Sequence, residues 1–141
     1  MRRSLATLLA AAGSIWASMA LGDLVVVVNA SNPVEQLSRS EVVDIYMGRR
    51  ATFPDGRTAL PIDLPSDSPL REAYYRSLVD KTIPQINSYW ARLLFTGRAT
   101  PPRALSDLDS VLETVAENRD AIGYADSDHL PPGVKVVLTL Q

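Results

Sequence analysis

The chain has 141 residues, with 14 basic and 16 acidic side chains and no cysteine. This length suits one domain with its own core, and the mildly acidic balance disfavours nucleic acid or an anionic membrane surface as a partner. The lack of cysteine excludes disulfide bonds and thiolate metal sites, so the core itself must stabilise the fold.

The first 22 residues have the pattern of a secretory signal peptide. Arg2 and Arg3 precede an apolar stretch at residues 5–12, and small residues allow cleavage after Ala20 or after Gly22. Cleavage after Gly22 leaves residues 23–141 as a single domain with 12 basic and 16 acidic residues, a net charge of −4. The alternative is an uncleaved N-terminal anchor. The sequence therefore predicts an exported protein, periplasmic or secreted, with no membrane span after cleavage.

Four segments are predicted to be strands. Residues 24–28 form a continuous run of one leucine and four valines, which is typical of a buried central strand. A second strand at 60–64 contains Pro61, which favours the beginning of a strand or an edge position. The last two strands are expected at 121–125 and 134–138.

Four helices are predicted from capping residues and apolar spacing. Three begin with a capping box, in which a Ser or Thr is followed three residues later by an acidic or amide side chain: Ser38 with Glu41, Thr82 with Gln85, and Ser106 with Asp109. The other is capped by Ser68 and has Pro69 in its first position. We expect its inner face to consist of Leu70, Ala73, Tyr74 and Leu78, with Ser77 as a further candidate, and we expect residues 98–103 to be a proline-stiffened connector. Alternating strands and helices predict an α/β domain with a mostly parallel sheet and helices on both faces.

Two phrases of the sequence resemble periplasmic phosphate-binding proteins of ABC importers. Ile45-Tyr46-Met47-Gly48, at the end of the first helix, is similar to the "IYLGKI" phrase of that family, and Ala121-Ile122-Gly123-Tyr124 is similar to its "GAIGY" strand. Between them, the stretch from Leu64 to Tyr74 stands in place of the family's phosphate-binding phrase "R-x-x-x-S-G-T". The resemblance implies one lobe of a type II periplasmic-binding-protein-like fold.

The phosphate-binding phrase differs at the positions that matter most for an anion. The family's arginine, which forms a forked contact with phosphate, aligns with Leu64. Its glycine aligns with Pro69, which has no N–H, and its threonine aligns with Leu70. Only Ser68 is retained. The chain is therefore expected to be a short single-lobe relative with an altered phosphate clamp.

The first functional hypothesis is a non-catalytic module similar to a phosphate ABC transporter substrate-binding protein. It would bind a small oxyanion such as phosphate through Ser31, Asn32, Ser66 and Ser68, with Arg71 supplying the positive charge. Ser31 and Asn32 follow a strand, where open α/β sheets bind ligands, and Ser66 and Ser68 lie at a helix N-terminus, which favours anions. Ordinary turn formation and helix capping explain the same residues.

The alternative hypothesis is a periplasmic interaction or sensor-accessory protein that has kept the lobe fold but lost solute binding, with an envelope protein as partner. The altered clamp residues Leu64, Pro69 and Leu70 motivate it. Arg98 and Arg103, beside Pro101-Pro102, suit an acidic ligand or a partner protein, although solvated arginine is the ordinary case. A hydrolase built on His129 and the neighbouring Ser127 is disfavoured, and no cofactor or metal ion is expected.

Overall fold

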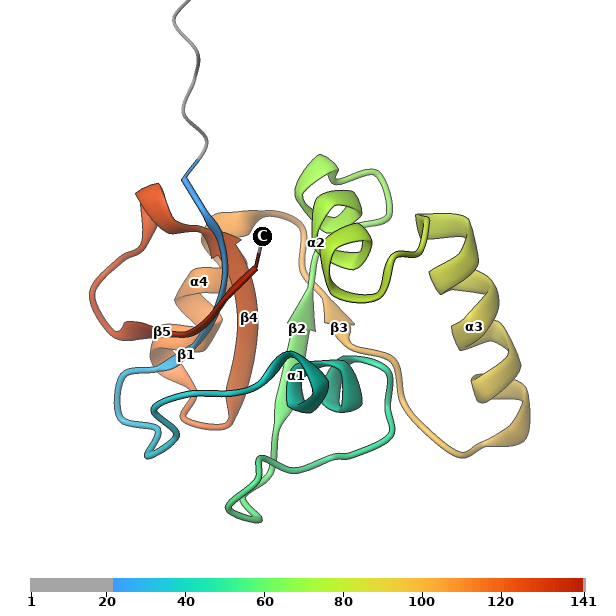
Figure 1. The fold of residues 1–141 in the computed structure, drawn as a ribbon, viewed down its shortest axis with the longest axis horizontal. Coiled ribbons are helices and arrows are strands. Elements are labelled where there is room, and N and C mark those ends of the chain that lie inside the picture. The colour runs from blue at the N-terminus through green and yellow to red at the C-terminus, as the bar shows by residue number, and fades with distance from the viewer. Residues whose placement is uncertain (1–21, 141) are drawn as a thin grey trace, which may run out of the picture.

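A computed structural model describes residues 22–140, so all of the predicted signal peptide except Gly22 lies outside the described residues. Strands and helices follow in the order β1 (Leu24–Asn29), α1 (Arg39–Tyr46), β2 (Leu60–Asp63), α2 (Pro69–Val79), α3 (Ile83–Thr96), β3 (Arg103–Ala104), α4 (Leu108–Glu117), β4 (Ala121–Asp126) and β5 (Val134–Leu140), with a short 3-10 helix at Ser127–His129 (Figure 1). Every helix in this part of the chain is too short or too polar to cross a membrane.

The five strands form one sheet in the order β3-β2-β4-β1-β5. β2 is parallel to both β3 and β4, whereas β1 is antiparallel to β4 and to β5. Four strands therefore share one direction and β1 alone runs against them, which confirms a mostly parallel sheet. β1 lies between two neighbours and Val25–Val28 are buried, as expected for a central strand.

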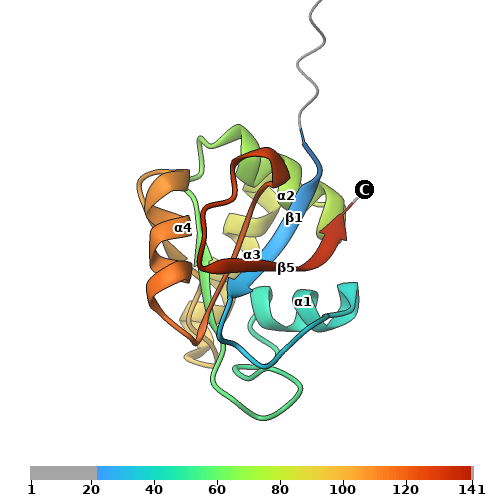
Figure 2. The same ribbon diagram turned by 90° about the vertical axis from the view of Figure 1, so that its left-hand side faces the viewer.

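Helices cover both faces of the sheet, also as predicted. α4 lies on one face, while α1 and α2 lie on the other (Figure 2). Gly123 lets α4 approach β4 closely, because a Cβ atom at this position would lie 3.1 Å from side-chain methyl groups of both Val111 and Val115. The neighbouring Tyr124 points to the other face, since side chains alternate along a strand.

Three local expectations are wrong. Arg103, expected to end a connector, instead begins β3, in which Arg103 and Ala104 pair in parallel with Ile62 and Asp63 at the edge of the sheet. The cap of α4 is Asp107 and not Ser106, because the Asp107 carboxylate accepts a hydrogen bond from the N–H of Ser110 at 2.8 Å.

The third wrong expectation concerns the inner face of α2. Ala73 is exposed, and the buried residues of the helix are Arg71, Tyr74, Tyr75 and Leu78. Tyr74 and Leu78 are buried as expected, and apolar spacing is wrong only for the rest of the face, because Arg71 and the phenol of Tyr75 are buried here through polar contacts. The other two capping boxes and the Ser68 cap are confirmed.

α3 lies at the β3 side of the molecule (Figure 1), and side-chain contacts hold it to the end of α1. Its only buried residues are Ile86 and Trp90, and the hydroxyl of Tyr89 donates a hydrogen bond to the carbonyl of Met47 at 2.6 Å. Gly48 ends α1 with a positive φ of 74°, and a Cβ atom there would lie 2.6 Å from the Trp90 ring. This glycine therefore allows both the turn of the chain and the approach of α3.

We expect Gly48→Ala to lower the free energy of unfolding by about 2–3 kcal/mol, because it combines left-handed backbone strain with a clash against Trp90. Gly97→Ala is the matched control, since Gly97 also has a positive φ, 68°, but a Cβ atom there would have open space for 4 Å around it. The control should lose only about 1 kcal/mol, the backbone contribution. Urea denaturation of both variants measures the difference, and equal losses would contradict the packing role of Gly48.

Candidate functional site

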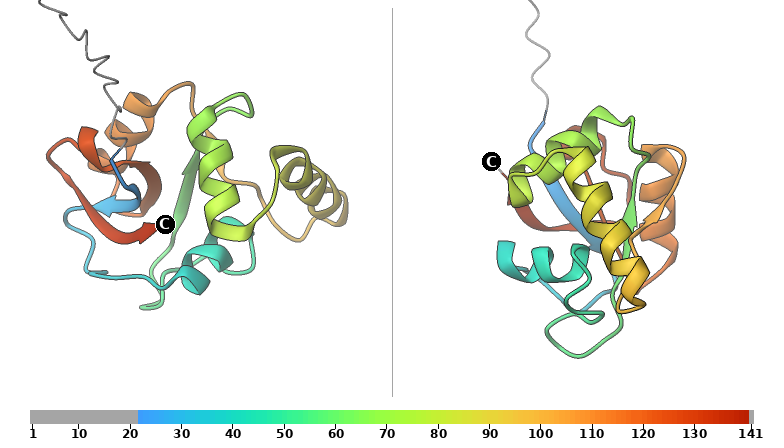
Figure 3. Two further views of the ribbon diagram at one scale, coloured as in Figure 1. Left: turned by 45° about the horizontal axis from the view of Figure 1, so that its top comes forward. Right: turned by 90° about the vertical axis from the view of Figure 1, so that its right-hand side faces the viewer.

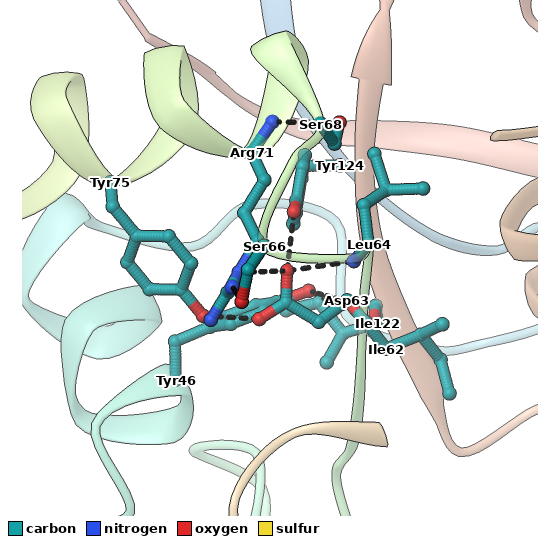
Figure 4. Close-up of polar contacts among 10 residues, drawn as sticks. All are labelled: Tyr46, Ile62, Asp63, Leu64, Ser66, Ser68, Arg71, Tyr75, Ile122 and Tyr124. Atoms are coloured by element: carbon teal, nitrogen blue, oxygen red, sulfur yellow. Dashed lines mark hydrogen bonds and ion pairs between the residues drawn. The ribbon is translucent and has the colours of Figure 1, made fainter. Parts of the chain in front are cut away.

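The carboxylate of Asp63 is buried at the end of β2, where it is surrounded by hydrogen-bond donors (Figure 4). One oxygen accepts a hydrogen bond from the hydroxyl of Tyr75 at 2.5 Å. The other accepts from the hydroxyl of Tyr124 and from the N–H of Leu64. A carboxylate removed from water is tolerated when its oxygens are satisfied in this way, so these donors make the burial of Asp63 possible.

Arg71 supplies the matching positive charge from the first turn of α2. Its Nε lies 3.4 Å from Asp63 Oδ1, and its Nη1 donates a hydrogen bond to Ser66 Oγ at 2.7 Å. The guanidinium also lies over the ring of Tyr75, with Cζ 5.4 Å from the ring centroid. Because only 8% of the residue is exposed, the guanidinium contacts groups of the protein far more than solvent.

Four buried tyrosines, Tyr46, Tyr74, Tyr75 and Tyr124, pack around this ion pair. The hydroxyl of Tyr46 donates hydrogen bonds to the carbonyls of Ile62 and Ile122 and so joins α1 to β2 and β4. The rings of Tyr74 and Tyr124 stack with centroids 3.7 Å apart. Burial raises the pKa of all four phenols, and for all except Tyr74 the negative charge of Asp63 is the second cause. The four phenols therefore remain neutral near neutral pH, and those of Tyr46, Tyr75 and Tyr124 donate hydrogen bonds.

A shallow cleft of about 490 Å³ lies where β2 ends and α2 begins. Its lining includes Leu64, Ser68 and Leu70 together with the side chains of Asp67 and Asp107, and no basic residue lines it. The hydrogen bond from the Ser110 N–H lowers the pKa of Asp107, so this carboxylate is negatively charged near neutral pH. The cleft at the start of α2 is therefore acidic and partly apolar, which disfavours an anion.

Three of the five sequence-predicted site residues come together at the carboxyl end of β2. Ser66 accepts the hydrogen bond from Arg71, and Ser68 caps α2 by accepting from the N–H of Arg71 at 3.2 Å. Both hydroxyls therefore bind a group of the protein itself. Arg71 is not a solvated charge beside them, because it is paired with Asp63.

The structure places Ser31 and Asn32 at the opposite end of the strands, where β4 begins. β1 runs against its neighbours, so its carboxyl end lies beside Ile122 at the start of β4 and away from Asp126 at its end. Asn32 is buried, donates to the carbonyl of Arg119 at 3.1 Å and accepts from the N–H of Val34 at 2.9 Å. The structure thus does not bring these two residues to the α2 N-terminus.

Sequence analysis missed Asp63, Tyr75 and Tyr124 as partners of Arg71. One signal was available: Arg71 and Tyr75 are four residues apart, so they lie on the same face of a helix. Asp63, the single charge at the end of an apolar strand, was the second signal. His129 is exposed, and the nearby Asp126 carboxylate accepts from the N–H of Asp128, so it caps the short helix.

We expect Arg71→Leu to lower the free energy of unfolding by about 3–5 kcal/mol, because it leaves the buried Asp63 carboxylate without its counter-charge. Arg76→Leu, on the exposed side of the same helix, is the matched control. Arg76 forms only a solvated pair with Asp80 at 3.9 Å, so its loss should change stability by less than about 1 kcal/mol. Chemical denaturation of both variants checks this, and similar small losses would show that the Asp63–Arg71 pair is not important for the fold.

The raised phenol pKa values predict a steep loss of stability at alkaline pH. A phenol whose folded-state pKa is above its unfolded value stabilises the fold fully below about pH 10, and this contribution falls as the unfolded chain ionises above that pH. Each of the four buried tyrosines contributes at most about 1.4 kcal/mol per pH unit to the fall in the free energy of unfolding. Urea denaturation between about pH 9 and 11 measures it. Phenolate absorbance that rises while circular dichroism remains native would contradict the prediction.

Comparison with solved structures shows which known fold this chain shares. An ABC-type phosphate transport receptor from Vibrio cholerae aligns with a TM-score of 0.65 and 18% identity, over 82% of this chain and 45% of the receptor. A protein from Clostridium perfringens named as a putative phosphate ABC transporter substrate-binding protein, solved with bound phosphate, gives the same TM-score and identity over 82% of this chain and 44% of its own. A possible phosphate-binding protein from Planctomyces limnophilus aligns with a TM-score of 0.59 and 14% identity, over 83% of this chain and 41% of its own.

No protein-family model matches the chain, and a search of curated proteins gave no significant match. The chain spans less than half the length of the first two solved structures. The resemblance to phosphate-binding proteins in the sequence is therefore confirmed at the level of the fold: residues 22–140 have the fold of one lobe of a phosphate ABC transporter substrate-binding protein.

Proposed function

We propose that the protein is an exported, non-catalytic interaction module that has kept the lobe fold and uses it to bind a partner protein of the cell envelope. One observation carries this proposal: Arg71, the cation nearest to the altered clamp, is already in an ion pair with the Asp63 carboxylate. An anion that enters here would have to compete with a buried carboxylate that is already held by two phenols and one backbone N–H.

The surroundings of the clamp support the same proposal. Leu64 and Pro69 replace the forked cation and the backbone donor that phosphate needs. Asp67 and Asp107 add two negative charges to the adjoining cleft. Binding a phosphate-sized anion there would require desolvating it against like charge, which is unfavourable.

The second candidate is a phosphate-binding module, the first hypothesis of the sequence analysis. The two solved structures of phosphate transport proteins favour it, since one of them contains phosphate, and the chain aligns with about 45% of each. Ser66 and Ser68 lie at the start of α2, where the helix dipole favours negative charge. In this candidate Arg71 must leave Asp63 or be shared between the carboxylate and the ligand.

Isothermal titration of the purified protein with phosphate and with sulfate separates the two candidates. We expect no saturable heat up to about 1 mM ligand, a limit that corresponds to a binding free energy of about −4 kcal/mol. The physical reason is the neutralised Arg71. The protein should also show no thermal stabilisation by phosphate at the same concentration.

Arg71→Lys provides the control for the phosphate-binding candidate. Lysine retains the charge but loses the planar fork, so phosphate binding through Arg71 would be weakened by this change. Saturable binding by the wild-type protein that is lost in Arg71→Lys would refute the proposal and establish the second candidate. Binding that is unchanged in Arg71→Lys would also refute the proposal and would place the anion elsewhere.

A further inference from the structure

The C-terminal half of α3 presents large apolar side chains to solvent. Phe95 is 94% exposed and Leu94 is 55% exposed, although both lie in a regular helix. The helix contacts the body of the protein through Ile86 and Trp90, and its opposite side faces away from the sheet (Figure 3). Phe95 and Leu94 together give this end of α3 an exposed apolar surface of the kind that a partner can cover.

The chain around Phe95 is basic in an otherwise acidic domain. No acidic residue occurs between Asp80 and Asp107, whereas this stretch contains Lys81, Arg92, Arg98 and Arg103. Arg92 lies three residues before Phe95, so the two are neighbours on the helix surface. The stretch after the helix adds Arg98 and Arg103 beside Pro101-Pro102.

Two clefts connect these arginines with the end of α1. One, of about 430 Å³, is lined by Arg50, Arg98 and Arg103, and the other, of about 740 Å³, is lined by Arg49, Arg92 and Arg98. No acidic side chain lines either cleft. Arg49 has an exposed pair with Asp44 at 3.7 Å, and the remaining four arginines form no ion pair with a carboxylate of residues 22–140.

This surface is held in place by the fold. Trp90 packs over Gly48, and Tyr89 donates to the carbonyl of Met47, so α3 is fixed to the end of α1 beside Arg49 and Arg50. Proline at 101 and 102 restricts the backbone that carries Arg98 and Arg103. A partner would therefore meet a preorganised surface and would lose less entropy on binding.

We propose that this surface docks an acidic segment of the partner protein. We call it the Arg/Phe surface, and it consists of Arg49, Arg50, Arg92, Leu94, Phe95, Arg98 and Arg103. The inference rests on the proposed function and names its site. Arginine and aromatic side chains dominate the binding energy of protein interfaces, and carboxylates are the complementary charge for unpaired guanidiniums. The bound segment carries carboxylates around an apolar side chain that packs on Phe95.

Two other occupants fit the surface less well. A second copy would have to bring acidic side chains from a different face of the domain to the Arg/Phe surface, and such a head-to-tail contact closes into a ring or propagates into a filament. An anionic lipid surface is flat and would leave the two clefts unfilled, and the domain as a whole carries a net charge of −4 after cleavage at Gly22. The charge and the shape together favour a protein segment.

Site-specific photo-crosslinking in the cells that produce the protein tests this inference. Phe95 is replaced by p-benzoylphenylalanine in the full chain, and Glu113, exposed on α4 at the other face of the sheet, is replaced in the same way as a control. We expect a discrete adduct from position 95 and none from position 113, and the crosslinked peptide of the partner should contain Asp and Glu beside an apolar residue. Arg98→Glu with Arg103→Glu should reduce the adduct about ten-fold or more, since these changes reverse the charge of the surface.

The outcomes separate failure of the surface from failure of the function. A protein adduct from position 113 alone, or one that the Arg98→Glu/Arg103→Glu variant does not reduce, overturns the Arg/Phe surface but leaves the interaction module standing. Adducts only with lipid or with a second copy of the chain also overturn it. No adduct at either position overturns the surface, and saturable phosphate binding in the isothermal titration overturns the proposed function itself. Circular dichroism of the charge-reversed variant confirms that it is folded.

Discussion

The buried Asp63 carboxylate is the constraint on which the centre of this fold depends. A charge taken out of water costs several kcal/mol unless donors and a counter-charge surround it, and here they come from α2, from β4 and from the backbone after β2. Tyr75 and Arg71 can reach Asp63 only when α2 lies across the end of β2, whereas Tyr124 reaches it from the neighbouring strand β4. The carboxylate therefore fixes the position of α2 on the sheet, and the same contacts leave Arg71 little freedom to bind anything else.

The direction of β1 limits what the lobe can bind. In a sheet whose strands all run the same way, the loops after every strand meet at one edge and can share a ligand. Here β1 is antiparallel to both neighbours, so Ser31 and Asn32 lie at one end of the strands and Ser66 and Ser68 lie at the other. Asn29 and Asn32 instead bind backbone carbonyls at the end of α4 and after it. These asparagines connect β1 to α4, and a stabilising role accounts for all of their polar contacts.

Local signals in the sequence predicted most of the fold, because caps, apolar periodicity and β-branched runs act over a few residues. The strands at Leu24–Asn29 and Ala121–Asp126 and the helix ends at Gly48 and Gly97 follow from such signals. The direction of β1, the pairing of Arg103 and Ala104 with β2, and the burial of Arg71 depend on residues far apart in the chain, and no local pattern contains them. The candidate site was predicted in part for the same reason: the α2 N-terminus is a local feature, whereas its neutralisation by Asp63 requires the folded sheet.

The contrast between Arg71 and the arginines around α3 indicates where binding free energy remains available. The guanidinium of Arg71 has its carboxylate, its hydroxyl and its aromatic ring inside the protein, so a ligand gains little by approaching it. Arg92, Arg98 and Arg103 have no carboxylate partner among residues 22–140, and Phe95 has almost no contact with the rest of the fold. A charge that is already paired inside the protein adds little free energy when a partner binds. An exposed ring and unpaired charges can form new contacts with a partner and so add to the binding free energy. The start of α2 and the Arg/Phe surface therefore differ in what they offer a partner: the arginine of the first is paired inside the protein, whereas the charged and apolar side chains of the second remain exposed.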